Sequence, residues 1–490
     1  MRSTLRHSSP ARMRRRMLAG TFAAMLVVAA CGSDDDDDAG DGTTDAPAAT
    51  DAPAATDAPS ATDAPAATDA PAATDAPAAT DAPAATDAPA ATDAPAATDA
   101  PAATDAPGTT GGGPATGEPI KVMTVAPINS QLPPYPNIHE AARIYGEWIN
   151  DRGGINGRPL EVVLCDGKGD PNEDANCGRQ AAEEGVVALV GSFTFDASQL
   201  IPILEDENIA MFGSCCPIAE IEFSSPVSFV TGSNFAIPAG AVARMVDDGC
   251  ESPAVVYIET AATDFANDVA KDVFRFKGFD PDAATYVTIP ITAQDYSAQV
   301  AQAIDGTDCI YGGIADSNWA AFLPAMESLG GDQRLYGHQG NLNSVIAAQF
   351  PELTQDGISV NSYPNIEGPM WEDYRAALEE YDAPDLDWNS LAGLGTWSAY
   401  EAFVGIVSEM DGEITNETFM EAANNATAVD TGGMVPVLDL SKPFEAMGGA
   451  FPRIFNRTVT FDRIDNGVLT ATDDPPVDMT EALEAYTPGD

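Results

Sequence analysis

The sequence predicts an α/β fold in which two lobes are each built on a parallel sheet. Two observations lead to this prediction. From Pro119 onward, short apolar runs alternate with amphipathic stretches of helical period, which is the pattern of repeated strand–helix–strand units. The 373 residues from Glu118 to the C-terminus also exceed what one hydrophobic core normally holds, so two compact lobes are expected.

The first strand–helix–strand unit is defined by local signals. "IKVMTVAPI" predicts a strand, and the helix after it has one apolar face and ends at the glycine pair 153–154. The Asn-Gly pair at 156–157 then turns the chain into the strand "PLEVVLC". Asp170 is predicted to cap the next helix, with Pro171 at its first position and Glu173 placed for a capping box.

The remaining elements follow the same alternation. Further strands are predicted at 186–191, 209–213, 227–232, 254–259, 309–313, 334–339 and 357–363. Helices are predicted at about 197–206, 236–248, 264–277, 296–304, 317–329, 371–381 and 390–410. The tail alternates apolar and polar residues around Asp465-Asn466-Gly467, which predicts a hairpin.

The N-terminal segment, residues 1–31, is predicted to be a lipoprotein signal peptide. Six arginines precede an apolar run of 14 residues, which is too short to span a bilayer and right for the core of a signal peptide. The run ends in "VAAC" and resembles a bacterial lipobox, which implies cleavage before Cys31 and lipidation of that cysteine. The alternatives are an ordinary signal peptide with a chance cysteine and, for the arginines, the twin-arginine export route.

Residues 32–118 are predicted to form a disordered acidic tether. The hexapeptide "TDAPAA" recurs to about Pro107, and no large apolar residue lies between Ser33 and Pro119. Such a segment cannot bury enough surface to offset the entropy lost on ordering, and its regular prolines and like charges favour extended conformations. A passive spacer is the simplest interpretation, while threonine beside proline also allows an O-glycosylated stalk.

The body of the chain is strongly acidic. Residues 118–490 contain 59 acidic and 16 basic side chains, a net charge of −43. A surface of this charge repels nucleic acid and anionic lipid headgroups, so neither is predicted as a partner.

Six cysteines follow Cys31, and an even number in an exported chain predicts disulfides. Cys165 ends a predicted strand, and Cys177 lies two turns into the next helix. A bridge between these two would hold the loop 166–170 in place. The first predicted disulfide is therefore Cys165–Cys177.

The other four cysteines form two further pairs. Cys250 and Cys309 lie at the starts of apolar runs, and the starts of neighbouring parallel strands lie side by side, so a second disulfide is predicted there. Cys215 and Cys216 form either a vicinal disulfide or two thiols. No metal site is predicted, because the chain has no CxxC pair and only two histidines after the signal peptide.

Three stretches of the body resemble a known family in order and spacing. They are "NDRGGINGRPLEVVLCDGKGDPNEDANCGRQ", "VALVGSF…LIPILEDENIAMFG" and "CIYGGIADSNWAAFLPAMESLG". They closely resemble type I periplasmic (solute) binding proteins of the branched-chain amino acid and amide ABC importers, the Leu/Ile/Val-binding type. The resemblance covers about 119–470 and implies two Rossmann-like lobes joined by three hinge crossings. It implies that lobe one is 119–237 plus 364–436, and lobe two 238–363 plus 437–490.

A ligand is expected beyond the carboxyl ends of the parallel strands, where loops and helix N-termini converge. The loops concerned, called the contact loops below, are 126–137, 191–198 and 213–219 in lobe one and 259–265, 314–318 and 337–341 in lobe two. By resemblance, the ligand-binding residues are Tyr135, Thr194, Phe195, Ser198, Cys215, Cys216, Phe265, Asp316 and Gln339. Alternatively, Thr194 and Ser198 only cap the helix 197–206, and Tyr135 is an ordinary surface tyrosine. The neighbouring His338 is either a further ligand contact or a loop histidine that points to solvent.

Gln339 is the sharpest departure from the family pattern. It stands where the family commonly has an acidic residue that pairs with the ammonium group of the ligand. A neutral amide cannot neutralise a buried cation, whose unpaired burial is costly. Either another acid (Asp316, Asp264 or Asp196) takes this role, or the ligand lacks an ammonium group.

The predicted function is that of a binding protein rather than an enzyme. The resemblance and the lipobox imply a monomeric receptor, lipid-anchored at Cys31 to the outer face of the bacterial cytoplasmic membrane. It would capture a small polar solute, such as an amino acid or amide, and deliver it to an ABC permease of the branched-chain amino acid type. The alternative is a ligand sensor of the same fold without a transport role. No cofactor is predicted. The sequence has no GxSxG or phosphate-binding motif that would indicate catalysis. The one catalytic alternative is redox chemistry at Cys215–Cys216.

Overall fold

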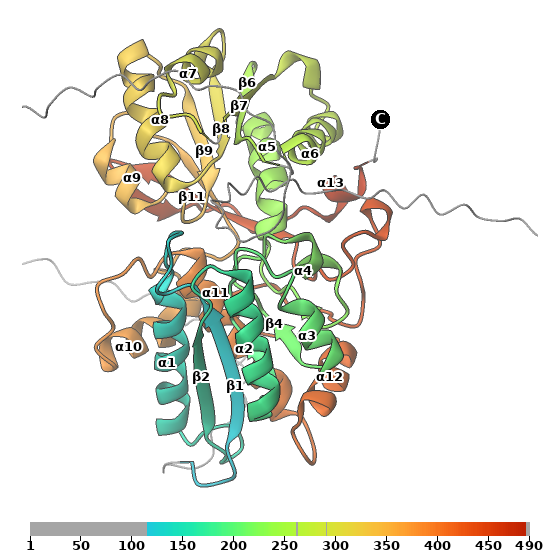
Figure 1. Cartoon of the computed structure of the whole chain (residues 1–490). Coiled ribbons are helices and arrows are strands. Elements are labelled where there is room, and N and C mark those ends of the chain that lie inside the picture. The colour runs from blue at the N-terminus through green and yellow to red at the C-terminus, as the bar shows by residue number, and fades with distance from the viewer. Residues whose placement is uncertain (1–114, 261–262, 291, 487–490) are drawn as a thin grey trace, which may run out of the picture. The chain divides into compact units, whose positions relative to one another are not determined.

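The computed structural model describes residues 115–260, 263–290 and 292–486 (Figure 1). The predictions for the signal peptide, the lipidation site Cys31 and the tether up to residue 114 lie outside the described residues. Within the described part of the chain, no helix combines the length and apolar character needed to cross a membrane.

The first sheet has five strands, all parallel, in the order β2-β1-β3-β4-β5. Its strands are β1 (Ile120–Ala126), β2 (Leu160–Asp166), β3 (Ala188–Val190), β4 (Ala210–Phe212) and β5 (Ser228–Phe229). The helices that alternate with them are α1 (Pro136–Asp151), α2 (Pro171–Glu184), α3 (Ile201–Asp206) and α4 (Glu220–Ser224).

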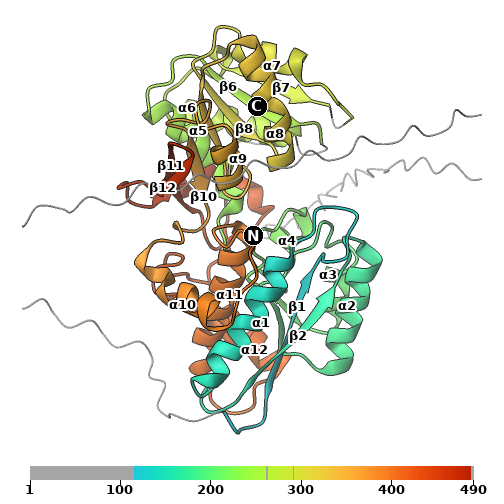
Figure 2. The same cartoon turned by 90° about the vertical axis from the view of Figure 1, so that its left-hand side faces the viewer.

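A later part of the chain returns to this sheet. It comprises the 3-10 turn η3 (Pro369–Trp371) and the helices α10 (Glu372–Glu380), α11 (Leu391–Ser408) and α12 (Asn416–Asn425). Helix α11 packs against α1, and α12 contacts β4 (Figures 1 and 2). The first core therefore combines two segments that are far apart in the sequence.

The second sheet has the strand order β12-β11-β10-β9-β8-β6-β7, and β13 pairs with β11. Its strands are β6 (Pro253–Ile258), β7 (Thr285–Ile289), β8 (Cys309–Gly313), β9 (Arg334–His338), β10 (Ile358–Asn361), β11 (Thr458–Asp465), β12 (Val468–Ala471) and β13 (Val477–Asp478). Pairing is parallel from β7 to β10 and antiparallel where β11 joins β10, β12 and β13.

Helices cover both faces of this second sheet. They are α5 (Ile237–Asp247), α6 (Thr263–Phe276), α7 (Ser297–Ile304), α8 (Asp316–Leu329), α9 (Ser344–Gln349) and α13 (Thr480–Glu484), with 3-10 turns η1 (Asn234–Ala236), η2 (Pro281–Ala283) and η4 (Met447–Gly449). Val255 of β6 packs in a cluster with α5 and α6, whereas its neighbour Val256 packs in a second cluster with α7 and α8. Successive strand residues point to opposite faces, so one strand serves two core layers.

These observations confirm the predicted fold class, an α/β structure with two largely parallel sheets. The exact limits of the lobes stay a prediction. The core of the first sheet includes Leu438, Leu440 and Phe455, which follow the expected end of lobe one at residue 436.

Several predicted elements differ from the observed ones. Strand β7 was not predicted, because it alternates buried and exposed residues at the edge of the sheet and contains no continuous apolar run. Helix α12 was missed as well, since only three of its ten residues are buried. The helix expected to begin at residue 197 begins at Ile201, after a turn, and β5 is shorter than the predicted strand 227–232.

Local signals for the start of α2 and for the C-terminal hairpin are confirmed. The carboxylate of Asp170 accepts a hydrogen bond from the backbone N–H of Asn172 at 2.8 Å, and Pro171 is the first helical residue. The expected capping box does not form, because the Glu173 side chain binds Lys168 and Asn176 instead. β11 and β12 pair around Asn466-Gly467, both with positive φ, as a two-residue hairpin turn requires.

The six described cysteines form three disulfides. Cys165 is joined to Cys177, with a Cα–Cα distance of 5.8 Å, and Cys250 to Cys309, with a Cα–Cα distance of 6.0 Å. Both are the predicted pairs. The third bridge joins Cys215 to Cys216. Of the two alternatives for this pair, a vicinal disulfide or two thiols, the structure contains the disulfide.

Candidate functional site

The carboxyl ends of β1, β3 and β4 carry a small apolar cluster, called the lobe-one rim cluster below. Its buried members are Ala126, Ile138, Phe193, Cys215 and Ala392, and its half-buried members are Ile128, Tyr135, Phe195 and Cys216. Four of the nine predicted ligand-binding residues therefore lie together. They come from three contact loops that are separated in sequence, which meet because parallel strands end at the same edge of a sheet.

Three aromatic rings pack together in this cluster. Tyr135 meets Phe193 edge-on with a centroid distance of 4.9 Å, and Phe193 meets Phe195 edge-on at 5.1 Å. Burial raises the pKa of the Tyr135 hydroxyl, and the negative charge of Asp316 raises it further. Asp316 is the exposed first residue of α8 on the second sheet. The charge of Asp316, next to the second sheet, thus acts on Tyr135, next to the first sheet.

Thr194 lies between the two phenylalanines of the rim and is 1 % exposed. Its Oγ1 has no hydrogen-bond partner among the described residues. A buried hydroxyl without a partner costs free energy, so this atom is the clearest unused hydrogen-bonding group of the rim. Ser198 is exposed, and neither residue caps a helix, because α3 starts at Ile201 with Leu200 at its N-cap.

The loop 213–219 is held in place by a buried carboxylate. Glu222 accepts hydrogen bonds from Ser214 Oγ at 3.2 Å, from Ile218 N at 3.0 Å and from Ala219 N at 2.9 Å. Burial raises the pKa of Glu222 to about 7, and the three hydrogen bonds oppose this rise. The vicinal disulfide therefore sits in a loop whose two sides are tied to one side chain.

Gln339 follows β9 and is buried, but its amide has partners in the protein. Its Oε1 accepts from the backbone N–H groups of Ser362 and Tyr363, at 3.1 and 3.2 Å, and its Nε2 donates to the Tyr363 carbonyl at 3.1 Å. Gln339 stands at the position expected to face the ammonium group of the ligand, but its side-chain amide binds the backbone of Ser362 and Tyr363.

The neighbouring His338 is directed into the second core. Its Nε2 pairs with the Tyr311 hydroxyl, and the two rings stack with an interplanar angle of 13°. Burial lowers the pKa of His338 to about 4, so the imidazole is neutral at neutral pH. The alternative of a histidine pointing to solvent is not what the structure shows.

Phe265, the aromatic residue predicted for lobe two, belongs to a different ring cluster. Its ring meets those of Tyr486 at 5.5 Å, Phe451 at 5.9 Å and Phe235 at 6.4 Å. The structure therefore does not place Phe265 in the lobe-one rim cluster.

Sequence reasoning missed four residues that shape this region. They are Phe193, Glu222, Tyr363 and Asp174, and Asp174 is a buried acid in the first turn of α2. A Cβ at Gly167 would lie 1.9 Å from Asp174 Oδ1, so only glycine leaves room for this carboxyl. Burial raises the pKa of Asp174 to about 7. Only Phe193 had a visible signal, the alternating aromatic pattern "SFTF".

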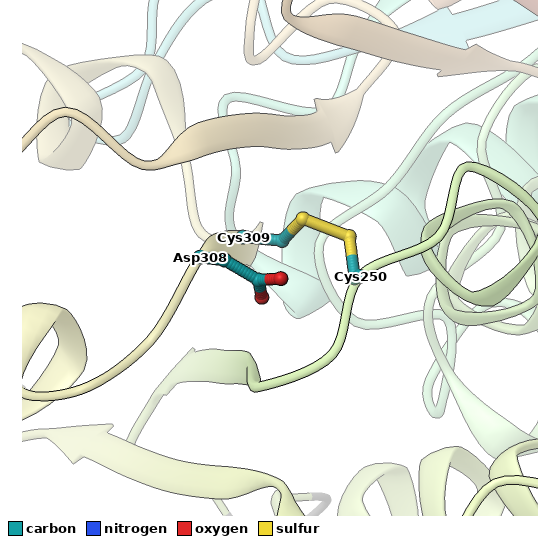
Figure 3. Close-up of side chains that lie close together, drawn as sticks. All are labelled: Cys250, Asp308 and Cys309. Carbon is teal, nitrogen blue, oxygen red and sulfur yellow. A yellow bond between two sulfur atoms is a disulfide. The ribbon is translucent and has the colours of Figure 1, made fainter.

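Cys250, Asp308 and Cys309 bring three potential metal-ligand atoms together (Figure 3). Both sulfurs are in the disulfide, and the Asp308 carboxylate accepts from Glu251 N at 2.7 Å and Ser252 N at 3.0 Å. A disulfide sulfur is not the thiolate that metals bind. The group therefore fastens the start of β8 to the segment before β6.

A family model described as "Periplasmic binding protein" matches residues 119–443. The chain therefore belongs to the periplasmic binding protein family, as the resemblance predicted. Family membership implies an extracytoplasmic location.

A curated relative is the leucine-, isoleucine-, valine-, threonine- and alanine-binding protein of Pseudomonas aeruginosa. It is 29 % identical over 104 residues, which cover 21 % of this chain and 28 % of the relative. The match thus spans less than a third of that relative's length. The relatives are solute-binding proteins and not enzymes.

Solved structures show the same fold along nearly their whole length. A possible leucine/isoleucine/valine-binding protein from Rhodopirellula baltica has a TM-score of 0.59 and 15 % identity, covering 76 % of this chain and 99 % of its own. A substrate-binding periplasmic protein from Ralstonia solanacearum has a TM-score of 0.58 and 16 % identity, and the match covers 72 % of this chain and 99 % of that protein. A fatty acid ABC transporter substrate-binding protein from Thermomonospora curvata has a TM-score of 0.57 and 16 % identity, with coverage of 77 % and 97 %.

Proposed function

We propose that this protein is a lipid-anchored receptor that captures a small polar solute between its two lobes and delivers it to an ABC importer of the branched-chain amino acid type. The observation that carries the proposal is the lobe-one rim cluster. It gathers predicted contact residues at the strand ends, where ligands of open α/β sheets bind. Family membership supports the same reading.

Within this proposal, lobe one supplies the larger part of the binding surface. Tyr135, Phe195 and the disulfide Cys215–Cys216 contact the apolar part of the solute, while Thr194 Oγ1 and Ser198 bind its polar group. From lobe two, Asp316 completes the contacts as the lobes close, whereas Phe265 stays in its own ring cluster. A solute that touches both lobes stabilises the closed arrangement by its extra contacts there.

The contact loops also restrict the charge of the solute. They contain no lysine or arginine and four acids, Asp196, Glu259, Asp264 and Asp316. A net anion would meet no cation there, so we infer a neutral, zwitterionic or cationic solute. Asp316 is exposed and makes no ion pair within the described residues, and its charge acts on the aromatic Tyr135. Carboxylate and aromatic ring together attract an ammonium group, so Asp316 takes the role that Gln339 does not fill.

The cellular setting belongs to the same proposal. Lipidation at Cys31 holds the chain on the outer face of the cytoplasmic membrane, and residues 32–118 act as a tether between membrane and body. The partners are then a small-molecule solute and an ABC permease, with the receptor acting as a monomer.

Calorimetry on the purified body, with a panel of amino acids, amides, ureas and small carboxylates, tests solute binding. We expect heat of binding with at least one uncharged, zwitterionic or cationic solute and none with net anions. Absence of binding across the panel would refute the proposal. Uptake of the identified solute by a strain lacking the gene then separates transport from sensing, because unimpaired uptake favours the sensor.

A further inference from the structure

Two chain segments that pass from one sheet toward the other lie side by side. The first follows β5 and the second follows β10. Ser233 of the first uses both its backbone N–H and its hydroxyl to bond Ser362 Oγ of the second, at 3.0 and 3.3 Å. All three of these groups are buried, so the two crossing segments are tied together in the interior.

Gln339 fastens the second crossing segment to the second sheet. Its side chain bonds the backbone of two successive residues, Ser362 and Tyr363, with Oε1 accepting twice and Nε2 donating once. Its own backbone N–H bonds the Val360 carbonyl of β10 at 2.9 Å. One buried residue therefore fixes the direction in which the chain leaves β10.

Tyr363 extends this connection to lobe one. Its fully buried hydroxyl donates to the Cys215 carbonyl at 3.4 Å, in the contact loop of the vicinal disulfide. The space around it is closely filled, because a Cβ on Gly395 would lie 2.9 Å from Tyr363 Oη and 2.8 Å from Cys215 Cβ. A Cβ on Gly232 would lie 2.5 Å from the same hydroxyl.

We propose that Gln339 is a positioning residue that holds the crossing segment after β10 and, through Tyr363, positions the vicinal-disulfide loop of lobe one. The inference rests on the proposed function only in that this loop contacts the solute. It gives position 339 a role that an acidic residue could not fill, because a carboxylate has no proton to donate to the Tyr363 carbonyl and would face that oxygen with like charge. The observed hydrogen bonds therefore require an amide at position 339.

Hydrogen exchange of the full mature chain, without ligand, tests the coupling. In Gln339→Met, which keeps the size but removes the hydrogen bonds, we expect the amides of Ser362 and Tyr363 and the peptide 213–219 to exchange roughly tenfold faster, as for a locally destabilised unit. In Tyr363→Phe, which removes only the hydroxyl, we expect faster exchange in 213–219 while the backbone amides at positions 362 and 363 stay protected. If 213–219 exchanges at the wild-type rate in both variants, the coupling does not exist.

Affinity measurements distinguish positioning from direct contact. We expect Gln339→Met and Gln339→Glu to weaken every solute that binds by a similar factor. A change of more than about tenfold in the affinity ratio between an ammonium-bearing solute and its neutral isostere, with unchanged exchange, would make Gln339 a ligand contact and overturn the inference. If the wild-type protein binds nothing, the proposed function fails, while the exchange experiment still decides the role of Gln339.

Discussion

The contact loops of lobe one and of lobe two are built differently. In lobe one, the loops pack in an apolar cluster, contain a vicinal disulfide and are hydrogen-bonded to the buried Glu222. In lobe two, Asp316 is exposed, Phe265 packs in a separate ring cluster, and the Gln339 side chain binds the chain segment after β10. The difference indicates a division of roles. In the proposed function, lobe one would offer a preorganised surface that saves ordering entropy on binding, and lobe two would add charge on closure.

The largest expected effect concerns the rigidity of lobe one. Glu222→Leu leaves the Ser214 hydroxyl and the N–H groups of Ile218 and Ala219 without their acceptor, so we expect a loss of about 3 kcal/mol in the free energy of unfolding, measured with urea. The matched control in lobe two is Asn318→Ala, at the start of α8, where Asn318 bonds Ala315 N and the Tyr296 hydroxyl. There we expect a loss of about 1 kcal/mol. Equal losses would remove the contrast between the lobes.

The pH dependence of stability should report the buried acids of lobe one. The pKa values of Asp174 and Glu222 rise from 3.8 and 4.5 to about 7 in the folded chain. Each acid then binds more protons when folded, so the free energy of unfolding falls as pH rises from about 4 to 7, by on the order of 2 kcal/mol for each group. Asp174→Asn and Glu222→Gln should flatten the fall in urea titrations at several pH values. If the free energy of unfolding of the wild type instead rises from about pH 4 to 7, and both variants show the same profile, the raised pKa values do not belong to Asp174 and Glu222.

Removing the unpartnered hydroxyl of Thr194 should change the affinity for the solute and not lower the stability of the fold. Thr194→Val keeps the shape and removes Oγ1, so we expect about tenfold weaker solute binding with stability equal to or above that of the wild type. Thr194→Ser, which keeps the hydroxyl, should bind like the wild type. Calorimetry and urea unfolding measure the two quantities. Unchanged affinity in Thr194→Val would place this hydroxyl outside the site.

The smallest effect concerns the charge of lobe two. Asp316→Asn should weaken ammonium-bearing solutes by about fivefold relative to neutral isosteres, because the lost attraction lies in a solvent-exposed part of the rim. Asp196→Asn, an exposed acid of the lobe-one rim, is the control and should change this ratio less. Competition calorimetry measures the ratio in both variants. If Asp196→Asn has the larger effect, the ammonium group is recognised by lobe one.

The sequence by itself determined what depends on near neighbours. The alternation of strands and helices, the cap at Asp170, the hairpin at Asn466-Gly467 and the bridge between Cys165 and Cys177 follow from patterns within about a dozen residues. The gathering of Tyr135, Phe195, Cys215 and Cys216 also followed, because the carboxyl ends of parallel strands share one edge.

Only the tertiary structure decided which partners the polar side chains of the site take. The Gln339 amide binds the backbone of Ser362 and Tyr363, more than 20 positions away, and Tyr363 bonds the Cys215 carbonyl across 148 positions. The edge position of β7 and the ring cluster around Phe265 were decided in the same way. Hydrogen bonds and packing depend on distance in space, and a local pattern carries no record of which distant segment will fill the neighbouring space.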